Sequence, residues 1–222
     1  MDGTSKTRSL RFRGLAFPGV EVLPGAVRRA MRAGEYDEAL IAAALRHART
    51  DDSVLIVGGG PGHIAGVLAA RLGVPRVTVT EPDPRLAAMI RGMAEENGLP
   101  RIALRPGLVA GAPGQTRLSA PKDPFGAVPG SAEDGPEVPL LGMAALERDH
   151  APTLLIASPR EAESLAMAES PFPGLRAAIL CLTPDRDGPA GTDAALAAMA
   201  AAGLTYAPRH SAGALLVFRR EA

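Results

Sequence analysis

The chain has 222 residues, a length typical of one α/β domain. Its 24 basic residues balance 24 acidic ones and only 3% of it is aromatic, so neither charge nor stacking rings favour a nucleic-acid or membrane partner. One Cys excludes an internal disulfide, and no residue spacing indicates a metal site, so we expect no bound metal. No apolar run is long enough to cross a membrane, so we expect a soluble cytoplasmic protein.

The first half of the chain has a regular alternation of helices and strands. It follows an N-terminal extension, residues 1–33, whose first 26 residues read as irregular. Apolar periodicity predicts helices at 35–49, 62–72 and 84–97, and strands at 54–57, 76–80 and 101–105. This order predicts a parallel sheet with right-handed crossovers.

The alternation stops over residues 106–139, which are rich in Gly and Pro. A loop of this length is uncommon inside a domain, so we interpret the segment as a flexible insertion or cover, or as one that holds a short strand. Afterwards the pattern predicts helices at 143–148, 160–168 and 193–202, strands at 153–157 and 177–183, and a closing strand pair at 204–207 and 214–219. Residues 34–222 are thus expected to form a single α/β domain around a mostly parallel, seven-stranded sheet with a C-terminal antiparallel hairpin.

A glycine turn follows the first of these strands. Gly58, Gly60 and Gly62 lie where open α/β sheets bind ligands, and Glu81 ends the next strand 23 residues after Gly58. A carboxylate at that place can accept hydrogen bonds from the hydroxyls of a ribose. Two ligand classes share this geometry, dinucleotides and S-adenosylmethionine. The dinucleotide pattern G-x-G-x-x-A is met by Gly60, Gly62 and Ala65, so both remain open.

Several motifs resemble those of FkbM-type S-adenosylmethionine-dependent methyltransferases. They are Gly34-Glu-Tyr-Asp37, Asp52-Ser-Val-Leu-Ile-Val-Gly-Gly-Gly-Pro-Gly62, Glu81-Pro-Asp-Pro84 and Asn97-Gly98. The resemblance implies a Rossmann-like class I methyltransferase fold with helices on both faces of the sheet, S-adenosylmethionine as cofactor, and O-methyl transfer to a small molecule or saccharide. It also implies these cofactor-binding residues: Tyr36, Gly58, Gly59, Gly60, Gly62, His63, Glu81, Pro82 and Asp83.

The chain departs from this family where catalytic groups are expected. Hydrophobic or basic side chains, or Ser, stand at positions where the family has acids: Ile56, Met143, Ser158 and Arg160. The remaining catalytic candidates are Glu161 and Glu163. The run from Ser158 to Glu161 is also a capping box that would start a helix without any catalytic role.

Two alternatives to an active methyltransferase therefore stay open. The first is a catalytically degenerate protein of the same fold with a binding or regulatory role, which the lost acids favour. The second is an NAD- or FAD-binding Rossmann protein, which would need a second cofactor contact. We further expect His63 to pack or to contact the ligand, and Cys181 to be an inert thiol in the core.

Overall fold

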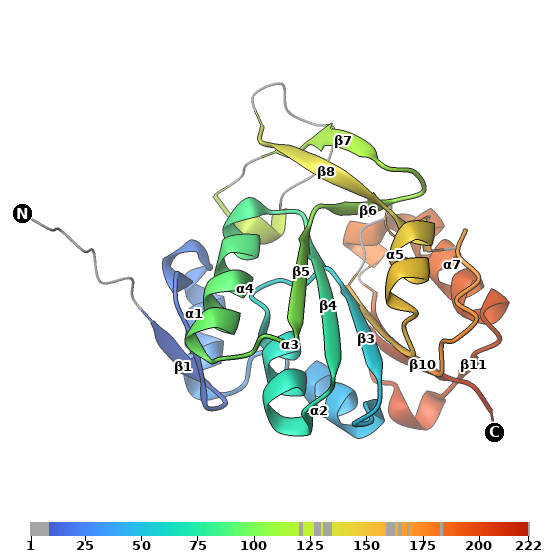
Figure 1. Ribbon diagram of the computed structural model, residues 1–222, viewed down its shortest axis with the longest axis horizontal. Coiled ribbons are helices and arrows are strands. Elements are labelled where there is room, and N and C mark those ends of the chain that lie inside the picture. The colour runs from blue at the N-terminus through green and yellow to red at the C-terminus, as the bar shows by residue number, and fades with distance from the viewer. Residues whose placement is uncertain are drawn as a thin grey trace, which may run out of the picture.

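The computed structural model describes residues 9–119, 122–126, 130, 135–158, 163, 166–167, 169–182 and 184–221. Its largest sheet has seven strands in the order β11-β12-β10-β9-β3-β4-β5 (Figure 1). The strands are β3 (Ser53–Val57), β4 (Arg76–Glu81), β5 (Ile102–Pro106), β9 (Leu154–Ala157), β10 (Ala177–Cys181), β11 (Thr205–Tyr206) and β12 (Leu215–Arg219).

Strand direction in this sheet agrees with the prediction. Strands β10, β9, β3, β4 and β5 pair in parallel, whereas β12 runs antiparallel to both β10 and β11. The predicted seven-stranded, mostly parallel sheet with a C-terminal antiparallel hairpin is therefore confirmed. At its centre Ile56 pairs with Val79 on one side and with Ile156 on the other.

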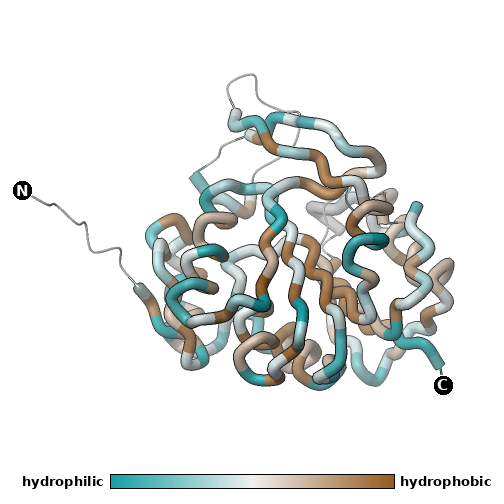
Figure 2. The backbone as a smooth tube through the Cα atoms, viewed as in Figure 1, coloured by the Kyte–Doolittle hydropathy of each residue, from teal (hydrophilic) through white to brown (hydrophobic). Residues whose placement is uncertain are grey.

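Helices cover both faces of the sheet, because side chains along a strand point alternately to opposite faces. From β3, Val54 and Ile56 join a core cluster with α2 (Glu38–His47), α3 (His63–Val67) and α4 (Pro84–Glu96). Leu55 and Val57 join a second cluster with α5 (Met143–His150) and α7 (Pro184–Ala201). The apolar colour in Figure 2 accordingly follows the central strands. No helix in the described part of the chain is long and apolar enough to span a membrane.

The N-terminal segment contains more regular structure than its sequence indicates. Strands β1 (Leu10–Phe12) and β2 (Leu15–Phe17) form an antiparallel hairpin, followed by η1 (Val20–Val22) and α1 (Gly25–Ala33). Phe12 and Phe17 are buried in the first core cluster. The hairpin turns through Arg13 and Gly14, which both have positive φ. Three-residue strands are too short for periodicity to reveal, and Arg-Gly is not a usual hairpin turn.

Residues 106–139 also hold strands. They contain β6 (Leu108–Ala110), β7 (Gly114–Arg117), η3 (Pro124–Gly126) and the start of β8 (Glu137–Gly142). These strands form a three-stranded sheet in the order β6-β8-β7, which lies across the end of the main sheet where β5 ends (Figure 1). The sequence pattern does not predict this small sheet, because β7 is exposed and polar and β8 contains Pro139. We call residues 107–142 the insert.

The last turn of the first crossover helix is unusual. Helix α3 continues directly into η2 (Leu68–Leu72), a π-helix, so the predicted helix at 62–72 is present with two geometries. Glycine ends it as expected, since Gly73 adopts a left-handed conformation after Leu72.

A buried ion pair joins the loop before β3 to the residue before β10. The Asp52 carboxylate is almost fully buried, and its Oδ2 atom lies 2.6 Å from Nη2 of Arg176. The backbone N–H of Arg49 donates to Oδ2 over 2.7 Å, and the Thr153 hydroxyl donates to Oδ1 over 2.7 Å. The Arg176 Nη2 atom also donates to the carbonyl oxygen of His47. This network holds three loops together with hydrogen bonds on both carboxylate oxygens.

Candidate functional site

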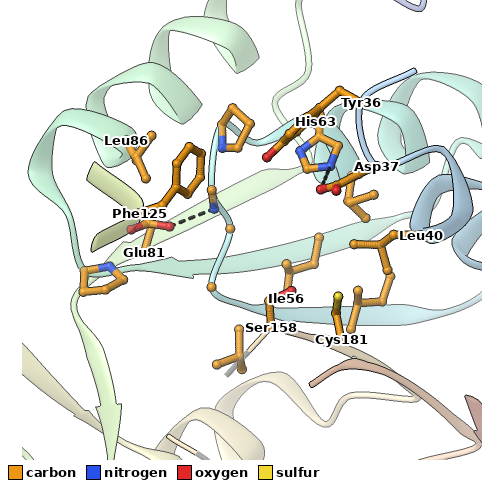
Figure 3. Close-up of a pocket in the computed structure, with 18 of the residues that line it drawn as sticks. Tyr36, Asp37, Leu40, Ile56, His63, Glu81, Leu86, Phe125, Ser158 and Cys181 are labelled. Carbon is orange, nitrogen blue, oxygen red and sulfur yellow. Dashed lines mark hydrogen bonds and ion pairs between the residues drawn. The ribbon is translucent and has the colours of Figure 1, made fainter. Parts of the chain in front are cut away.

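A cavity of about 220 Å³ lies at the carboxyl ends of β3, β4 and β9 (Figure 3). This is the edge at which open α/β sheets bind their ligands. Most of the cofactor-binding residues expected from the sequence line it, namely Tyr36, Gly58, Gly59, Gly60, His63, Glu81 and Pro82. The structure therefore brings together residues from three separate parts of the chain at one opening.

Two of the expected residues, Gly62 and Asp83, are not among the lining residues. A side chain at Gly62 would meet Ile90 and Met93 of α4, so this glycine permits helix packing. Asp83 is the N-cap of α4: its Oδ1 atom accepts from the backbone N–H of Arg85 over 2.8 Å. Its other oxygen forms an ion pair with the Arg85 guanidinium at 2.7 Å. Asp83 thus serves the start of a helix.

Glu81 connects the glycine turn to the start of α4. Its carboxylate is 3% exposed, its Oε2 atom accepts from the N–H of Gly60 over 2.8 Å, and its Oε1 atom accepts from the N–H of Asp83 over 2.9 Å. Each carboxylate oxygen has two lone pairs, so each can accept more than one hydrogen bond. Glu81 can both position the turn and contact a ligand.

The glycines of the turn have different roles. A Cβ atom at Gly59 would lie 2.3 Å from Cγ1 of Val79 and 3.0 Å from Cδ1 of Ile90, which is too close for any side chain. At Gly60, where φ is 53°, the nearest atom to such a Cβ is Cε1 of Phe125 at 3.6 Å. Gly59 therefore serves packing between the turn and the sheet, whereas Gly60 faces the cavity.

We expect Gly59→Ala to lower the free energy of unfolding by about 1–3 kcal/mol, the usual cost of overpacking, because Val79 is stiff and cannot move aside. Urea denaturation measures this change. Gly174→Ala is the matched control, since its Cβ would meet only an ordinary contact of 3.7 Å with the Pro152 carbonyl oxygen. Equal stabilities of the two variants would contradict the packing role.

At the other end of the cavity Tyr36, Asp37 and His63 form a cluster (Figure 3). The Nε2 atom of His63 lies 3.0 Å from Oδ2 of Asp37, and the Tyr36 and His63 rings meet edge to face with centroids 4.8 Å apart. His63 is 4% exposed, in accord with its expected packing role. Burial, followed by the nearby Asp37 carboxylate, raises the pKa of Tyr36 above its ordinary value, so the phenol stays neutral.

Several lining residues were not anticipated from the sequence as parts of a site, among them Asp37, Phe125 and Cys181. Phe125 comes from η3 of the insert and lies beside Glu81 and Leu86 (Figure 3). Cys181, expected as an inert core thiol, is instead partly exposed and lies below Asp37 in the same view. Of these three, Asp37 alone could have been expected near the cavity, because it follows Tyr36 in the motif Gly34-Glu-Tyr-Asp37.

Of the two catalytic candidates, Glu163 lines the cavity and is 1% exposed. Its Oε1 atom lies 3.5 Å from the N–H of Val109 in β6. Glu161 lies outside the described residues, as do Arg160 and most of the capping box that begins at Ser158. Ile56 and Ser158, at two of the positions where the resembled family has acids, also face the cavity, whereas Met143 packs in the second core cluster.

The charge of the cavity wall has one sign. Among the described lining residues are three carboxylates, Asp37, Glu81 and Glu163, and none of those residues is Lys or Arg. Two unlike charges 4 Å apart attract by about 4 kcal/mol near a protein surface, and like charges repel equally. Ionised carboxylates in this wall would attract a ligand that carries positive charge, and they can accept hydrogen bonds from its hydroxyl groups.

Comparison with known proteins identifies the fold. No family model and no curated protein matches the chain. Among solved structures it is similar to a precorrin-6y C5,15-methyltransferase from Geobacter metallireducens, with a TM-score of 0.50, 11% identity, and coverage of 82% of this chain and 87% of the other. A protein from Streptococcus pneumoniae described as a candidate tRNA (m1A22) methyltransferase gives a TM-score of 0.51 and 13% identity, covering 83% of this chain and 70% of the other.

A third similar structure is a protein in the NADB-Rossmann superfamily from Streptococcus agalactiae, with a TM-score of 0.50, 11% identity, and coverage of 83% of this chain and 68% of the other. At such identities the likeness concerns the fold alone. The mostly parallel seven-stranded sheet with helices on both faces matches the methyltransferases among these neighbours. The chain has a Rossmann-like fold of the class I methyltransferase type.

Proposed function

We propose that the chain binds S-adenosylmethionine in this cavity and transfers its methyl group to an acceptor. The observation that most directly supports this proposal is that the described residues of the cavity wall include three carboxylates and no lysine or arginine. S-adenosylmethionine brings a sulfonium and an ammonium, which this wall attracts, whereas a dinucleotide brings a pyrophosphate, which it repels. Two of the three similar structures named above are described as methyltransferases, one of them as a candidate, and this supports the same choice.

The residues present fit such a cofactor. The buried carboxylate of Glu81 would accept hydrogen bonds from the ribose hydroxyls, and Phe125 and Leu86 beside it would cover the purine. The cavity of about 220 Å³ is smaller than the roughly 300–1,000 Å³ of most ligand sites. We therefore expect Phe125 to shift when the cofactor enters.

The protein's part in methyl transfer is mainly placement. When bound, the cofactor supplies an electrophilic methyl group, and a hydroxyl acceptor must be aligned with it and must lose a proton. Glu163, buried against the cavity, is the candidate for holding that proton. The motif resemblance to FkbM-type enzymes supports an oxygen of a small molecule or saccharide as the acceptor.

Calorimetry of the purified chain tests the cofactor assignment. We expect S-adenosylmethionine and its demethylated product, S-adenosylhomocysteine, to bind with a Kd below millimolar, and NAD and FAD to show no binding. Saturable NAD or FAD binding without binding of S-adenosylmethionine would replace this proposal with a dinucleotide function. Transfer of a labelled methyl group to candidate acceptors then tests the reaction.

A non-catalytic binding role is the second candidate, and a specific observation favours it. Ile56 and Ser158 face the cavity at two positions where the resembled enzymes have acids. Under this alternative the chain binds S-adenosylmethionine but transfers no methyl group to any acceptor offered. Turnover of the labelled methyl group excludes it.

A further inference from the structure

Asp37 is a carboxylate that the assignment of Glu81 and Glu163 leaves without a role. It lies at the end of the cavity away from Glu81, with the glycine turn between the two (Figure 3). Its side chain is 40% exposed, so a ligand in the cavity can reach it.

The backbone holds Asp37 in an unusual conformation. Its φ of 50° and ψ of 35° lie in the left-handed region, although it is not a glycine. Its carbonyl oxygen accepts from the N–H of Ile41 over 2.9 Å, so the residue is held as the N-cap of α2. Residues kept in sparsely populated conformations cluster at ligand sites, where the surrounding structure maintains them.

The side chain is also held in place. Oδ2 of Asp37 lies 3.0 Å from Nε2 of His63, the residue that follows the glycine turn. His63 itself is fixed between the rings of Tyr36 and Phe12. One carboxylate oxygen therefore contacts a buried imidazole, and the other is left for a group in the cavity.

The described residues beside Asp37 in this wall include apolar ones. Ile56, at the end of β3, is 3% exposed and lines the cavity below Asp37, next to Leu40 (Figure 3). Both side chains are apolar. An ammonium group that enters this end would lose its hydration and would need a carboxylate in return. Of the residues labelled at this end, Asp37 supplies it.

We infer that Asp37, positioned by His63, accepts the α-ammonium of the cofactor's amino-acid part, in place of a carboxylate at Ile56. This rests on the proposed function, because it concerns one group of the same ligand. The acid that β3 lacks at Ile56 is thus supplied by Asp37, in the turn before α2, which lines the same end of the cavity. The site can therefore bind the α-ammonium although β3 carries an apolar residue at Ile56.

Calorimetry with two ligands tests this assignment. S-adenosylhomocysteine carries the α-ammonium, whereas 5′-methylthioadenosine keeps the nucleoside and lacks the amino-acid part. We expect Asp37→Asn to weaken S-adenosylhomocysteine binding at least tenfold and to change 5′-methylthioadenosine binding less than twofold, because a hydrogen bond between charged groups is lost. Glu38→Gln is the matched control: this carboxylate is 70% exposed, lies 3.6 Å from Arg13, and should affect neither ligand.

A rescue variant sharpens the result. Asp37→Asn combined with Ile56→Asp restores a carboxylate at the same end of the cavity, and we expect it to recover S-adenosylhomocysteine binding. If the double variant does not fold, as judged by circular dichroism, the single variant still decides. Unchanged affinity in Asp37→Asn, or an equal loss for both ligands, overturns the inference. Failure of the wild-type chain to bind either ligand instead overturns the proposed function.

Discussion

Replacement of Arg176 by Ala is expected to lower the free energy of unfolding by about 3–5 kcal/mol, because it leaves a buried charge without its partner. The Asp52 carboxylate is 2% exposed and would keep only its contacts with the Arg49 N–H and the Thr153 hydroxyl. The same change removes the hydrogen bond from Arg176 to the His47 carbonyl oxygen. Urea denaturation at neutral pH measures the loss.

Arg148→Ala provides the matched control for this effect. Arg148 forms an ion pair with Asp149 at 3.4 Å, but the two side chains are 72% and 57% exposed. Exposed pairs contribute about 0–1 kcal/mol, so this variant should remain close to the wild-type stability. Similar losses in both variants would show that burial of Asp52 does not decide the strength of its pair.

Glu81→Gln is expected to weaken S-adenosylhomocysteine binding by about 10- to 100-fold, or roughly 1.4–2.8 kcal/mol. Two effects add. The amide removes the negative charge that the ribose hydroxyls would meet. It also places an NH₂ donor against the N–H of Gly60 or of Asp83, where the carboxylate now accepts from both, so the glycine turn loses part of its support.

The control for this variant is Glu96→Gln, which alters an exposed carboxylate at the end of α4. It should leave the Kd of S-adenosylhomocysteine within about twofold, a change of roughly 0.4 kcal/mol. An affinity of Glu81→Gln equal to that of the wild type would remove Glu81 from the proposed ribose contact. Thermal unfolding of both variants separates loss of the turn from loss of the ligand contact.

The main sheet could be predicted because each of its central strands is buried on both faces. After Ser53, strand β3 is Val-Leu-Ile-Val, an unbroken apolar run that two core clusters share. Glu81 could be predicted as a site residue because its distance along the chain from the glycine turn places it at the end of the adjacent strand. Both features are encoded in short, continuous stretches of the sequence.

The remaining features depend on contacts that are distant in sequence. Phe125 reaches Glu81 from a segment that reads as irregular, and no periodicity marks a three-residue element such as η3. Asp83 looks like part of the ligand motif, yet it caps α4, because a carboxylate at an N-cap satisfies free N–H groups. Sequence spacing places a side chain near a site but does not determine which way it points.

The insert has a consequence for how this chain can diverge. Its strands pair with one another and not with strands of the seven-stranded sheet, and the insert is joined to the end of β4 by a hydrogen bond from the Gly107 N–H to the Glu81 carbonyl oxygen over 3.0 Å. It leaves the main sheet after β5 and returns at α5, and on the way it contributes Phe125 to the cavity. Substitutions in it can therefore reshape the mouth of the cavity while the hydrogen bonds of the main sheet, and Glu81 at its edge, are preserved. Related chains would then differ most in the molecules they admit and least in the nucleoside they hold.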